Sequence, residues 1–593
     1  MTTAPDTAAI DRFLADHLCD WLDCRDDWLW YSILAVSEAL REGHSCLNLA
    51  CWASATAWAT DEDPGYRFPE LDDWLNKLDQ LPIGPGDAAP LVLDQQRLYL
   101  RRYWRFETEL ADSIRSRLEP VPIEDADTAK NSLSRLFPSM QDGTETDWQA
   151  AAAANALFQK LSVIAGGPGT GKTFTVTRLL ALLAETEATG NESPLRVRMA
   201  APTGKAAQRL GESVREARQA LANAVAPETL ALIPDEATTL HRLLGVIPHQ
   251  VHFRHNRDNP LALDVLLVDE VSMIDLPMMT RLFRALPDHA RIILLGDPDQ
   301  LPSVAAGSVL ADLALRPHPG YSTQRQQQLA QLGLSVETGS TQSADYLSYL
   351  YRSRRFSDTG GIGKLARQVM DGDAEGSLET LKTEEDGLAW IEPEQVPAQI
   401  EHWVSQWYAP IAAADNRDAA FAALAEFRLL CPTRVGPLGS VALNERILKR
   451  LNPEGRPFYR GQPIMVTENH YGLGLFNGDI GLIWPDEDSD NQLLAWFPDA
   501  DGYRPLAPGR LPPVETVYAM TIHKTQGSEF ERVALILPEQ SHNVVSRELL
   551  YTGLTRARSQ AMICGRADVW KAGVRNPVER HSGLAERLFA ARN

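Results

Sequence analysis

The sequence predicts an α/β protein made of two parallel-sheet units, with a mainly helical N-terminal region and a small β-barrel inserted in the second unit. Between about residues 145 and 310, short apolar runs typical of strands alternate with helical patterns. A second stretch of this kind begins near residue 346. The length of 593 residues exceeds what one hydrophobic core supports. We therefore expect an N-terminal region at 1–125, a first α/β unit at 126–345 and a second at 346–593.

The N-terminal region is expected to be helical because its apolar side chains recur at helical spacing, as in residues 13–22 and 34–40. It carries 11 Lys or Arg against 24 Asp or Glu, which is most of the excess behind the net charge of −22. Such an acidic region is a poor surface for nucleic acid, although a local basic groove elsewhere would suffice. Segment 97–105 interleaves arginines with aromatic residues. We interpret it as a packed helix with a basic rim rather than as a nucleic-acid face.

Four of the six cysteines, Cys19, Cys24, Cys46 and Cys51, lie in the first tenth of the chain. Six cysteines in a chain of this length do not make a disulfide framework. A zinc or iron–sulfur site is one interpretation, but the four-residue gap within each pair is unusual for zinc ligands. Residues five apart also do not share a helix face, so we favour buried thiols.

The composition indicates a protein that is neither secreted nor embedded in a membrane. No apolar run reaches the ~18 residues of a membrane span. The first residues lack the basic start and the apolar core of a signal peptide. We expect a cytoplasmic location and no membrane partner.

The two α/β units contain several more specific signals. Strands of the first unit are expected at 161–165, 197–201, 265–268 and 292–295. Segment 246–262 is expected to form a small hairpin insertion, and segment 313–345, rich in Gln, Ser, Thr and Gly, a flexible loop. Strand-like runs between about 455 and 512, separated by turn signals such as Asn477-Gly478, predict the β-barrel insertion.

A phosphate-binding loop follows the first of these strands. Its eight residues match the pattern G-x-x-x-x-G-K-[ST], and they are Gly166, Gly167, Pro168, Gly169, Thr170, Gly171, Lys172 and Thr173. Glycines allow successive backbone N–H groups to face phosphate oxygens at a helix N-terminus. Lys172 would reach the β- and γ-phosphates, and the Thr173 hydroxyl would hold Mg²⁺. A structural glycine turn is the alternative, but the strand before the loop and the helix after it favour binding of ATP and Mg²⁺.

Two further strand ends carry polar groups suited to hydrolysis. Asp269 and Glu270 end the strand at 265–268, about a hundred residues after the phosphate loop. Asp269 would hold Mg²⁺ and Glu270 would polarise the attacking water. Gln300, after the strand at 292–295, is placed to sense the γ-phosphate. An ordinary turn is the alternative there, because Gly-Asp-Pro-Asp at 296–299 has good turn chemistry.

Taken together, these motifs resemble those of superfamily 1 helicases, and most closely the RecD family, the alpha subunit of exodeoxyribonuclease V (RecBCD). The resemblance runs in family order from about residue 145 to 565. Its other parts are Trp148-Gln149, motif Ia at 201–207, the next DNA-contacting motif at 238–244, motif IV at 351–356, motif V at 515–530 and motif VI at 550–558.

The resemblance implies two RecA-like motor domains, an SH3-like inserted barrel and roles for particular residues. Gln149 would read adenine, Gly527 and Glu529 would also bind the nucleotide, Arg355 would contact the γ-phosphate and Arg556 would be an arginine finger. With Lys172, Glu270 and Gln300, these two arginines form the expected catalytic set. The expected DNA-binding residues are Pro202, Thr203, Thr239, His241, Thr521 and His523. The two histidines have a structural role as their alternative.

The implied function is an ATP-dependent 5′–3′ DNA helicase or translocase in recombinational repair. It would work in a heterotrimer with RecB-like and RecC-like subunits on single- and double-stranded DNA ends, with its N-terminal region docked on a partner. A free-standing RecD-like or RNA helicase is the alternative. A structural subunit with a degenerate nucleotide site is a third hypothesis, which the intact motif residues argue against. No nuclease constellation is present in the sequence, so a nuclease activity would come from a partner.

Overall fold

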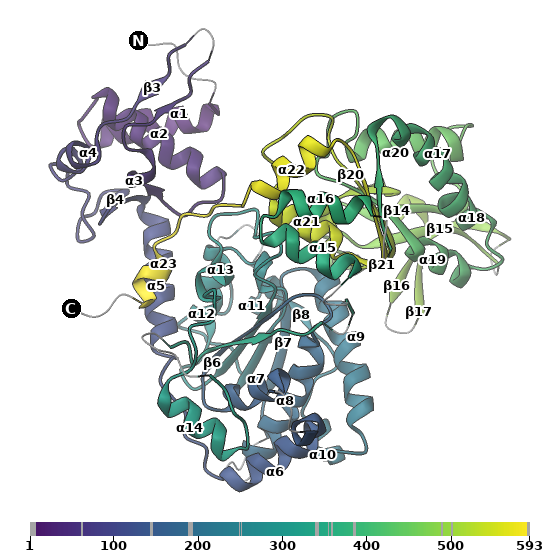
Figure 1. The fold of residues 1–593 in the computed structure, drawn as a ribbon, viewed down its shortest axis with the longest axis horizontal. Helices are drawn as coiled ribbons and strands as arrows, with labels where there is room; N and C mark the ends of the chain where they lie inside the picture. Colours follow the sequence, from purple (N-terminus) through teal and green to yellow (C-terminus); the bar gives the residue numbers. More distant parts are fainter. Residues whose placement is uncertain are drawn as a thin grey trace.

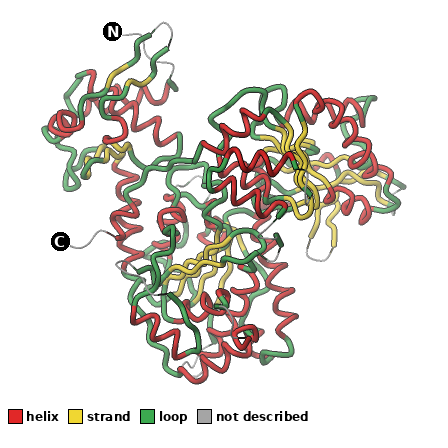
Figure 2. The backbone as a smooth tube through the Cα atoms, in the orientation of Figure 1, coloured by secondary structure: helices red, strands yellow, loops and turns green. Residues whose placement is uncertain are grey.

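The computed structural model describes residues 7–60, 63–142, 146–187, 194–247, 250, 252–337, 343–353, 355–356, 360–383, 387–487, 490–499 and 502–589. Figure 1 shows an N-terminal region in purple, a first α/β unit in blue and teal, and a second α/β unit in green and yellow. Strands are concentrated in the centres of the two units, with helices around them (Figure 2). No helix in these ranges is long and apolar enough to cross a membrane.

The first α/β unit is built on a six-stranded, fully parallel sheet in the order β11-β6-β10-β9-β7-β8. Its strands are β6 (Leu161–Gly166), β7 (Val197–Ala201), β8 (Thr238–Thr239), β9 (Val265–Val268), β10 (Arg291–Gly296) and β11 (Leu347–Leu350). All four strands predicted for this unit are present. Both faces of the sheet are buried, which explains why the strands are continuous apolar runs without alternation.

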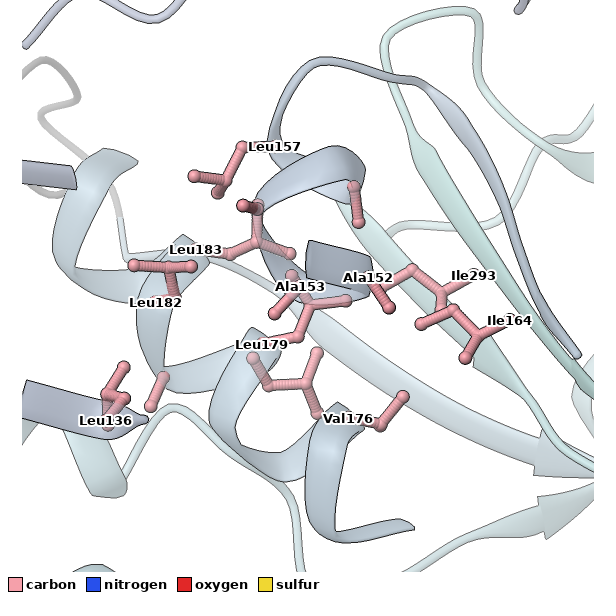
Figure 3. Close-up of a cluster of buried hydrophobic side chains, with 14 of the residues drawn as sticks. Leu136, Ala152, Ala153, Leu157, Ile164, Val176, Leu179, Leu182, Leu183 and Ile293 are labelled. Atoms are coloured by element: carbon pink, nitrogen blue, oxygen red, sulfur yellow. The ribbon is translucent and has the colours of Figure 1, made fainter. Parts of the chain in front are cut away.

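One face of this sheet is covered by α6 (Ala126–Leu136), α7 (Trp148–Leu157) and α8 (Lys172–Glu187). Figure 3 shows Val176, Leu179 and Leu183 of α8 beside Ala152 and Ala153 of α7. The run of five buried alanines at 150–154 lets the two helices approach closely, because alanine adds little bulk to the interface. The other face is covered by α12 (Leu276–Ala285) and α5 (Arg101–Arg115).

The predicted boundary between residues 345 and 346 is wrong. β11 pairs in parallel with β6, with Leu347 opposite Val163, so the first unit extends through Leu350. A boundary placed from local composition misses this, because the pairing joins strands that are far apart in the sequence.

The predicted loop at 313–345 is also wrong over part of its length, although residues 338–342 lie outside the described residues. It contains α14 (Thr323–Gln331), whose Leu329 is fully buried. Arg325 is 1% exposed and donates to the backbone O and Oδ1 of Asn155 at 2.9 and 2.8 Å. The glutamines that suggested a loop belong to the polar face of a short helix.

The hairpin predicted at 246–262 is only partly described, since residues 248, 249 and 251 lie outside the described ranges. Antiparallel bridges join Val246 to Phe253 and Asn256 to Asn259. These bridges agree with a chain that reverses direction here, as the polar, partly alternating sequence suggested.

The second α/β unit has a five-stranded parallel sheet in the order β12-β21-β20-β13-β19. Its strands are β12 (Leu388–Ile391), β13 (Phe427–Cys431), β19 (Ala519–Thr521), β20 (Phe530–Ile536) and β21 (Ala557–Cys564). One hydrophobic core includes residues of α15 (Gly361–Met370), α16 (Ala374–Lys382), α21 (Arg547–Leu554) and α22 (Ala567–Arg575). A separate core includes residues of α17 (Val396–Trp403), α19 (Arg417–Glu426) and α20 (Ser440–Leu451).

The predicted insertion forms a five-stranded antiparallel sheet in the order β17-β16-β15-β14-β18. Its strands are β14 (Gln462–Val466), β15 (Ile480–Asp486), β16 (Gln492–Asp499), β17 (Gly502–Leu506) and β18 (Val514–Thr516). β17 and β18 are the two edges of this sheet, and within the described residues they do not pair with each other. The sheet is therefore established, and its closure into an SH3-like barrel stays a prediction.

The N-terminal region combines helices with a small antiparallel sheet. The helices are α1 (Ala9–Trp21), α2 (Asp27–Arg41) and α4 (Leu71–Leu78), and the sheet has the order β1-β5-β4 with β1 (Leu47–Asn48), β4 (Leu91–Asp94) and β5 (Arg97–Leu100). The helix predicted over 97–105 is wrong for its first four residues. They form β5, which pairs with β4 across a turn where Gln95 has φ +56°, and α5 begins at Arg101.

The four N-terminal cysteines differ in their exposure to solvent. Cys19 and Cys46 are buried thiols as favoured, Cys24 is half-buried, and Cys51 is exposed. Within the described ranges, no group of His, Cys, Asp and Glu side chains is arranged to hold a metal ion.

The C-terminal tail leaves the second unit and returns to the N-terminal region, so the predicted assignment of residues 346–593 to one unit is wrong at its end. In Figure 1, the yellow helix α23 (Leu584–Phe589) lies beside α5. The contact centres on Glu107 of α5, whose carboxylate is fully buried. It accepts hydrogen bonds from Tyr99 at 3.1 Å, from the Gly583 N–H at 3.1 Å and from the Ser582 hydroxyl at 3.2 Å.

Replacing Glu107 should release the tail. In Glu107→Ala, the Gly583 N–H loses its acceptor, and hydrogen bonds to a charged group contribute about 1.5–3 kcal/mol each. We expect amide hydrogen exchange across 582–587 to accelerate by about tenfold or more. The control is Glu109→Ala on the same helix, where the removed carboxylate pairs with Arg284 at 2.8 Å and is partly exposed. Unchanged exchange in Glu107→Ala would contradict the anchoring role.

Candidate functional site

The two α/β units meet at a cavity of about 480 Å³. The first unit lines it with the carboxyl ends of its strands, and the second unit lines it with the segments that lead into β20 and β21. The first unit contributes the glycine loop after β6, the Asp269-Glu270 pair after β9 and Gln300 after β10. Arg355, from the chain just after β11, also lines it. The second unit contributes residues around 527–529 and 555–558. Loops at the carboxyl edge of a parallel sheet are where open α/β folds bind ligands.

Most residues predicted to bind or hydrolyse a nucleotide line this cavity. They are Pro168, Gly169, Thr170, Gly171, Lys172, Thr173, Asp269, Glu270, Gln300, Arg355, Gly527, Glu529 and Arg556. The remaining three are Gly166 and Gly167, which begin the loop, and Gln149, which is bonded to it. Gln149 donates from Nε2 to the Thr170 carbonyl at 2.9 Å, and Lys172 donates from Nζ to the carbonyls of Gly166 and Gly167 at 2.7 and 3.1 Å.

Two positions in the loop require glycine. Gly169 and Gly171 have φ values of +74° and +85°, which side chains rarely adopt. A Cβ at Gly169 would lie 2.5 Å from Cβ of Arg355, and one at Gly171 would lie 2.3 Å from Nε2 of Gln149. The loop is therefore packed directly against two other residues predicted to bind the nucleotide. The Ser353 hydroxyl strengthens this contact by donating to the Pro168 carbonyl at 2.9 Å.

The two carboxylates after β9 differ in their surroundings. The pKa of Asp269 is raised to about 6, mainly by burial and also by the neighbouring Glu270 carboxylate, while the Lys172 ammonium opposes both effects. Asp269 accepts the Glu270 N–H at 2.8 Å. Glu270 has φ +53°, a left-handed conformation that is uncommon for a residue with a side chain. This strained turn presents the second carboxylate at the cavity beside the first.

Three polar groups in the cavity wall have unused hydrogen-bonding capacity. Within the described part of the chain, Nη1 of Arg355, Nη2 of Arg556 and Oε1 of Gln300 are buried and have no hydrogen-bond partner. Buried polar groups are normally satisfied, so these atoms indicate a missing partner in the cavity. The two arginine nitrogens are donors suited to phosphate oxygens, and the glutamine oxygen is an acceptor suited to a water molecule.

Arg355 and Arg556 are both held by groups of the second unit. Arg355 makes an ion pair with Glu529 at 2.7 Å, which joins the first unit to the second. Arg556 is 4% exposed and donates from Nε to the Thr552 carbonyl at 3.0 Å and from Nη1 to the Ser528 carbonyl at 3.2 Å. The arginine predicted as a finger is thus fixed in the second unit and reaches the cavity from that side.

Sequence reasoning missed several residues around the cavity. Arg209 of α9 (Gly204–Leu221) and Arg558 lie 3.7 and 3.3 Å from the Glu529 carboxylate, which therefore faces three arginines. Asp297 accepts hydrogen bonds from both the Gln300 amide and the Tyr551 hydroxyl. Arg558 stands within motif VI, so a signal existed for it. No sequence pattern indicated Arg209, because its position depends on how the two units face each other.

The predicted DNA-contacting residues fall into two groups, one on each sheet. In the first, β7 and β8 pair with Ala201 opposite Thr239, which places Pro202 and Thr203 beside Thr239. Thr203 caps α9 and Thr239 caps α11 (Leu240–Leu244), each accepting a backbone N–H with its hydroxyl oxygen. The His241 ring remains in contact with solvent and packs edge-to-face against Phe253, with 5.9 Å between the two ring centroids.

The second group is smaller and lies at the corresponding edge of the second sheet. Thr521 ends β19, opposite Cys431 of β13, and His523 follows it in a short 3-10 helix. Partial loss of contact with water lowers the pKa of both His523 and His241, so both rings favour the neutral form. Neutral imidazoles suit stacking or hydrogen bonding more than ion pairing with phosphate.

Three family models match successive parts of the chain. They describe the "RecBCD enzyme subunit RecD, N-terminal domain" at residues 7–99, an "AAA domain" at 149–306 and a "UvrD-like helicase C-terminal domain" at 516–564. The curated RecBCD enzyme subunit RecD of Mycobacterium tuberculosis is 36% identical, over 98% of this chain and 94% of its own length. The chain belongs to the RecD family.

Two further relatives also have RecD-type names. RecBCD enzyme subunit RecD of Mycolicibacterium smegmatis is 37% identical, over 98% of this chain and 97% of its own length. The ATP-dependent RecD2 DNA helicase of Deinococcus radiodurans is 32% identical, over 86% of this chain and 61% of its own length. The similarity to the RecD subunits therefore covers the N-terminal region as well as both α/β units.

The glycine loop offers a test of the cavity as a nucleotide site. In Gly169→Ala, the new Cβ collides with Arg355 in addition to meeting an unfavourable φ, so affinity for ATP should fall by roughly tenfold or more. Gly333→Ala is the matched control, because Gly333 has φ +88° but no atom of the described residues lies within 4 Å of the new Cβ. Titration with a fluorescent ATP analogue measures both. Equal affinities for the two variants would count against the site.

Proposed function

We propose that this chain is an ATP-dependent 5′–3′ DNA helicase that works as the RecD-type subunit of a RecBCD-type complex in recombinational repair. The observation that carries the proposal is the cavity between the two units, where the phosphate loop and Arg556 come from different units. Membership of the RecD family over nearly the whole chain supports the identity of the complex.

The residues around the cavity have complementary tasks in ATP hydrolysis. The glycine loop and Lys172 would bind the phosphates, Gln149 would recognise the adenine, and Glu270 would orient and polarise the attacking water. Arg355 and Arg556 would stabilise negative charge on the transferred phosphoryl group, and arginines in this role are worth roughly 10³–10⁵ in rate. Since Arg556 belongs to the second unit, hydrolysis would require the two units to be closed on each other.

The donor set fits a magnesium ion. The hydroxyl of Thr173 and the carboxylate of Asp269 line the same cavity, and hydroxyl and carboxylate oxygens are the ligands that Mg²⁺ prefers. When bound there, Mg²⁺ would neutralise phosphate charge.

The DNA path in this proposal crosses the carboxyl edges of both sheets. Pro202, Thr203, Thr239 and His241 would contact the strand on the first unit, and Thr521 and His523 on the second. Hydroxyl and imidazole groups bind phosphates and bases without reading sequence, which suits a translocating enzyme. The inserted sheet would be the small SH3-like barrel expected for the family.

The proposed partners are RecB-like and RecC-like subunits in a heterotrimer, acting on single- and double-stranded DNA ends in the cytoplasm. The acidic N-terminal region, which matches the RecD subunit model, would provide the docking surface. The similarity to a RecD2 helicase keeps a free-standing helicase as the second candidate. Purification of the native protein separates the two: stable co-purification of both subunits supports the complex, and a solitary active chain contradicts it.

The ATPase assignment is tested by Lys172→Gln. Without the ammonium that neutralises phosphate charge, hydrolysis should become undetectable while the fold is kept, as checked by circular dichroism and thermal unfolding. Lys160→Gln is the control in the same unit, because its Nζ only donates to the Asp288 carbonyl at the surface. Near-normal turnover in Lys172→Gln would reject the proposed active site.

Polarity is tested by strand displacement with tailed duplexes. We expect the assembly in which only this chain retains its ATPase to unwind duplexes with a 5′ single-stranded tail and to leave 3′-tailed duplexes intact. The same substrates with the Lys172→Gln chain provide the background. Unwinding from 3′ tails alone would refute the proposed direction.

A further inference from the structure

A turn of the first unit, at residues 297–301, is docked on helix α21 of the second unit. The Leu301 N–H donates to the Thr552 hydroxyl at 2.9 Å, and the Leu301 carbonyl accepts from Nε2 of Gln526 at 3.1 Å. The Leu301 side chain is 5% exposed and packs within the hydrophobic core of the second unit. This turn is therefore bonded and packed as though it belonged to the opposite unit.

A buried carboxylate lies at the centre of this contact. Asp297 is 1% exposed, and its Oδ2 accepts from the Tyr551 hydroxyl at 3.0 Å and from Nε2 of Gln300 at 3.1 Å. Its Oδ1 accepts the Asp299 N–H at 3.0 Å. The amide of Gln300 is thus fixed through its nitrogen, and among the described residues its Oε1 has no hydrogen-bond partner at the cavity.

The same helix also fixes Arg556. The Thr552 hydroxyl receives the Leu301 N–H, and the Thr552 carbonyl receives Nε of Arg556 at 3.0 Å. Two series of hydrogen bonds therefore cross the boundary, one from Gln300 through Asp297 to Tyr551 and one from Leu301 through Thr552 to Arg556. Every residue of this series is buried. Separating the units would break the Asp297–Tyr551 and Leu301–Thr552 bonds together.

We propose that Asp297 and Tyr551 are positioning residues that hold Gln300 in register with the helix carrying Arg556, so that hydrolysis depends on the docked state of the two units. The inference rests on the proposed ATPase function and adds to it the contact through which the two units are coupled. Charge-assisted hydrogen bonds inside a low-dielectric contact are strong and directional, which suits them to this task. Neither residue needs to touch the nucleotide.

The test is the Tyr551→Phe variant. Its kcat for ATP hydrolysis and its affinity for a fluorescent ATP analogue are measured on the chain purified together with any subunits that bind it. Removing one hydroxyl that donates to a carboxylate should lower kcat by roughly tenfold, while the dissociation constant of a fluorescent ATP analogue stays within about twofold. Tyr408→Phe is the matched control, because Tyr408 is a buried tyrosine of the second unit whose hydroxyl donates to the Tyr518 carbonyl at 2.6 Å, outside the cavity. Its kcat should stay within about twofold of the unmodified chain.

A second variant tests whether the two residues act as one unit. Asp297→Ala should lower kcat at least as much as Tyr551→Phe, and the double variant should be no slower than Asp297→Ala alone, because the hydroxyl has then lost its acceptor. Three results would overturn the proposal: a Tyr551→Phe kcat equal to the control, a loss of affinity that matches the loss of turnover, or losses that multiply in the double variant. Absence of hydrolysis by the unmodified chain would overturn the ATPase function and the coupling together.

Discussion

The contact between the 297–301 turn and helix α21 is the interaction on which the rest of the site depends. The glycine loop and Arg556 belong to different sheets, and they share a cavity because Leu301 is inserted in the core of the second unit. The ion pair of Arg355 with Glu529 adds a second link across the same boundary. A cavity assembled in this way is complete only while the units are docked, which is a physical basis for converting hydrolysis into relative motion of two domains.

A second set of contacts holds the N-terminal region in place. Helix α5 packs on the first sheet through α12, and Glu107 on the same helix binds the tail that leaves the second unit. Tyr99 of the N-terminal sheet and Ser582 and Gly583 of the tail therefore meet at one buried carboxylate. Among the described residues that line the nucleotide cavity, none comes from the acidic N-terminal region.

The sequence predicted best what is encoded locally. The strands at 161–165, 197–201, 265–268 and 292–295 and the glycine loop were predictable, because apolar runs and glycine spacing are local signals. The place of β11, helix α14 and the path of the tail were not, since each depends on contacts between distant segments. The same holds for the site. Each motif residue could be identified from its own stretch of sequence. The clustering of three arginines around Glu529 and the hydrogen bonds to Asp297 could not, because they form only when the two units fold against each other.

If cations from both units act on the same phosphoryl group, a structure with ADP and aluminium fluoride bound should show both arginines on it. Arg355 should leave Glu529, and Arg355 and Arg556 should both donate to the fluoride atoms that mimic the transferred group. The Asp297–Tyr551 hydrogen bond should be retained. An analogue bound in the glycine loop with Arg355 still on Glu529 and Arg556 out of reach would show that the two units do not act on one phosphoryl group.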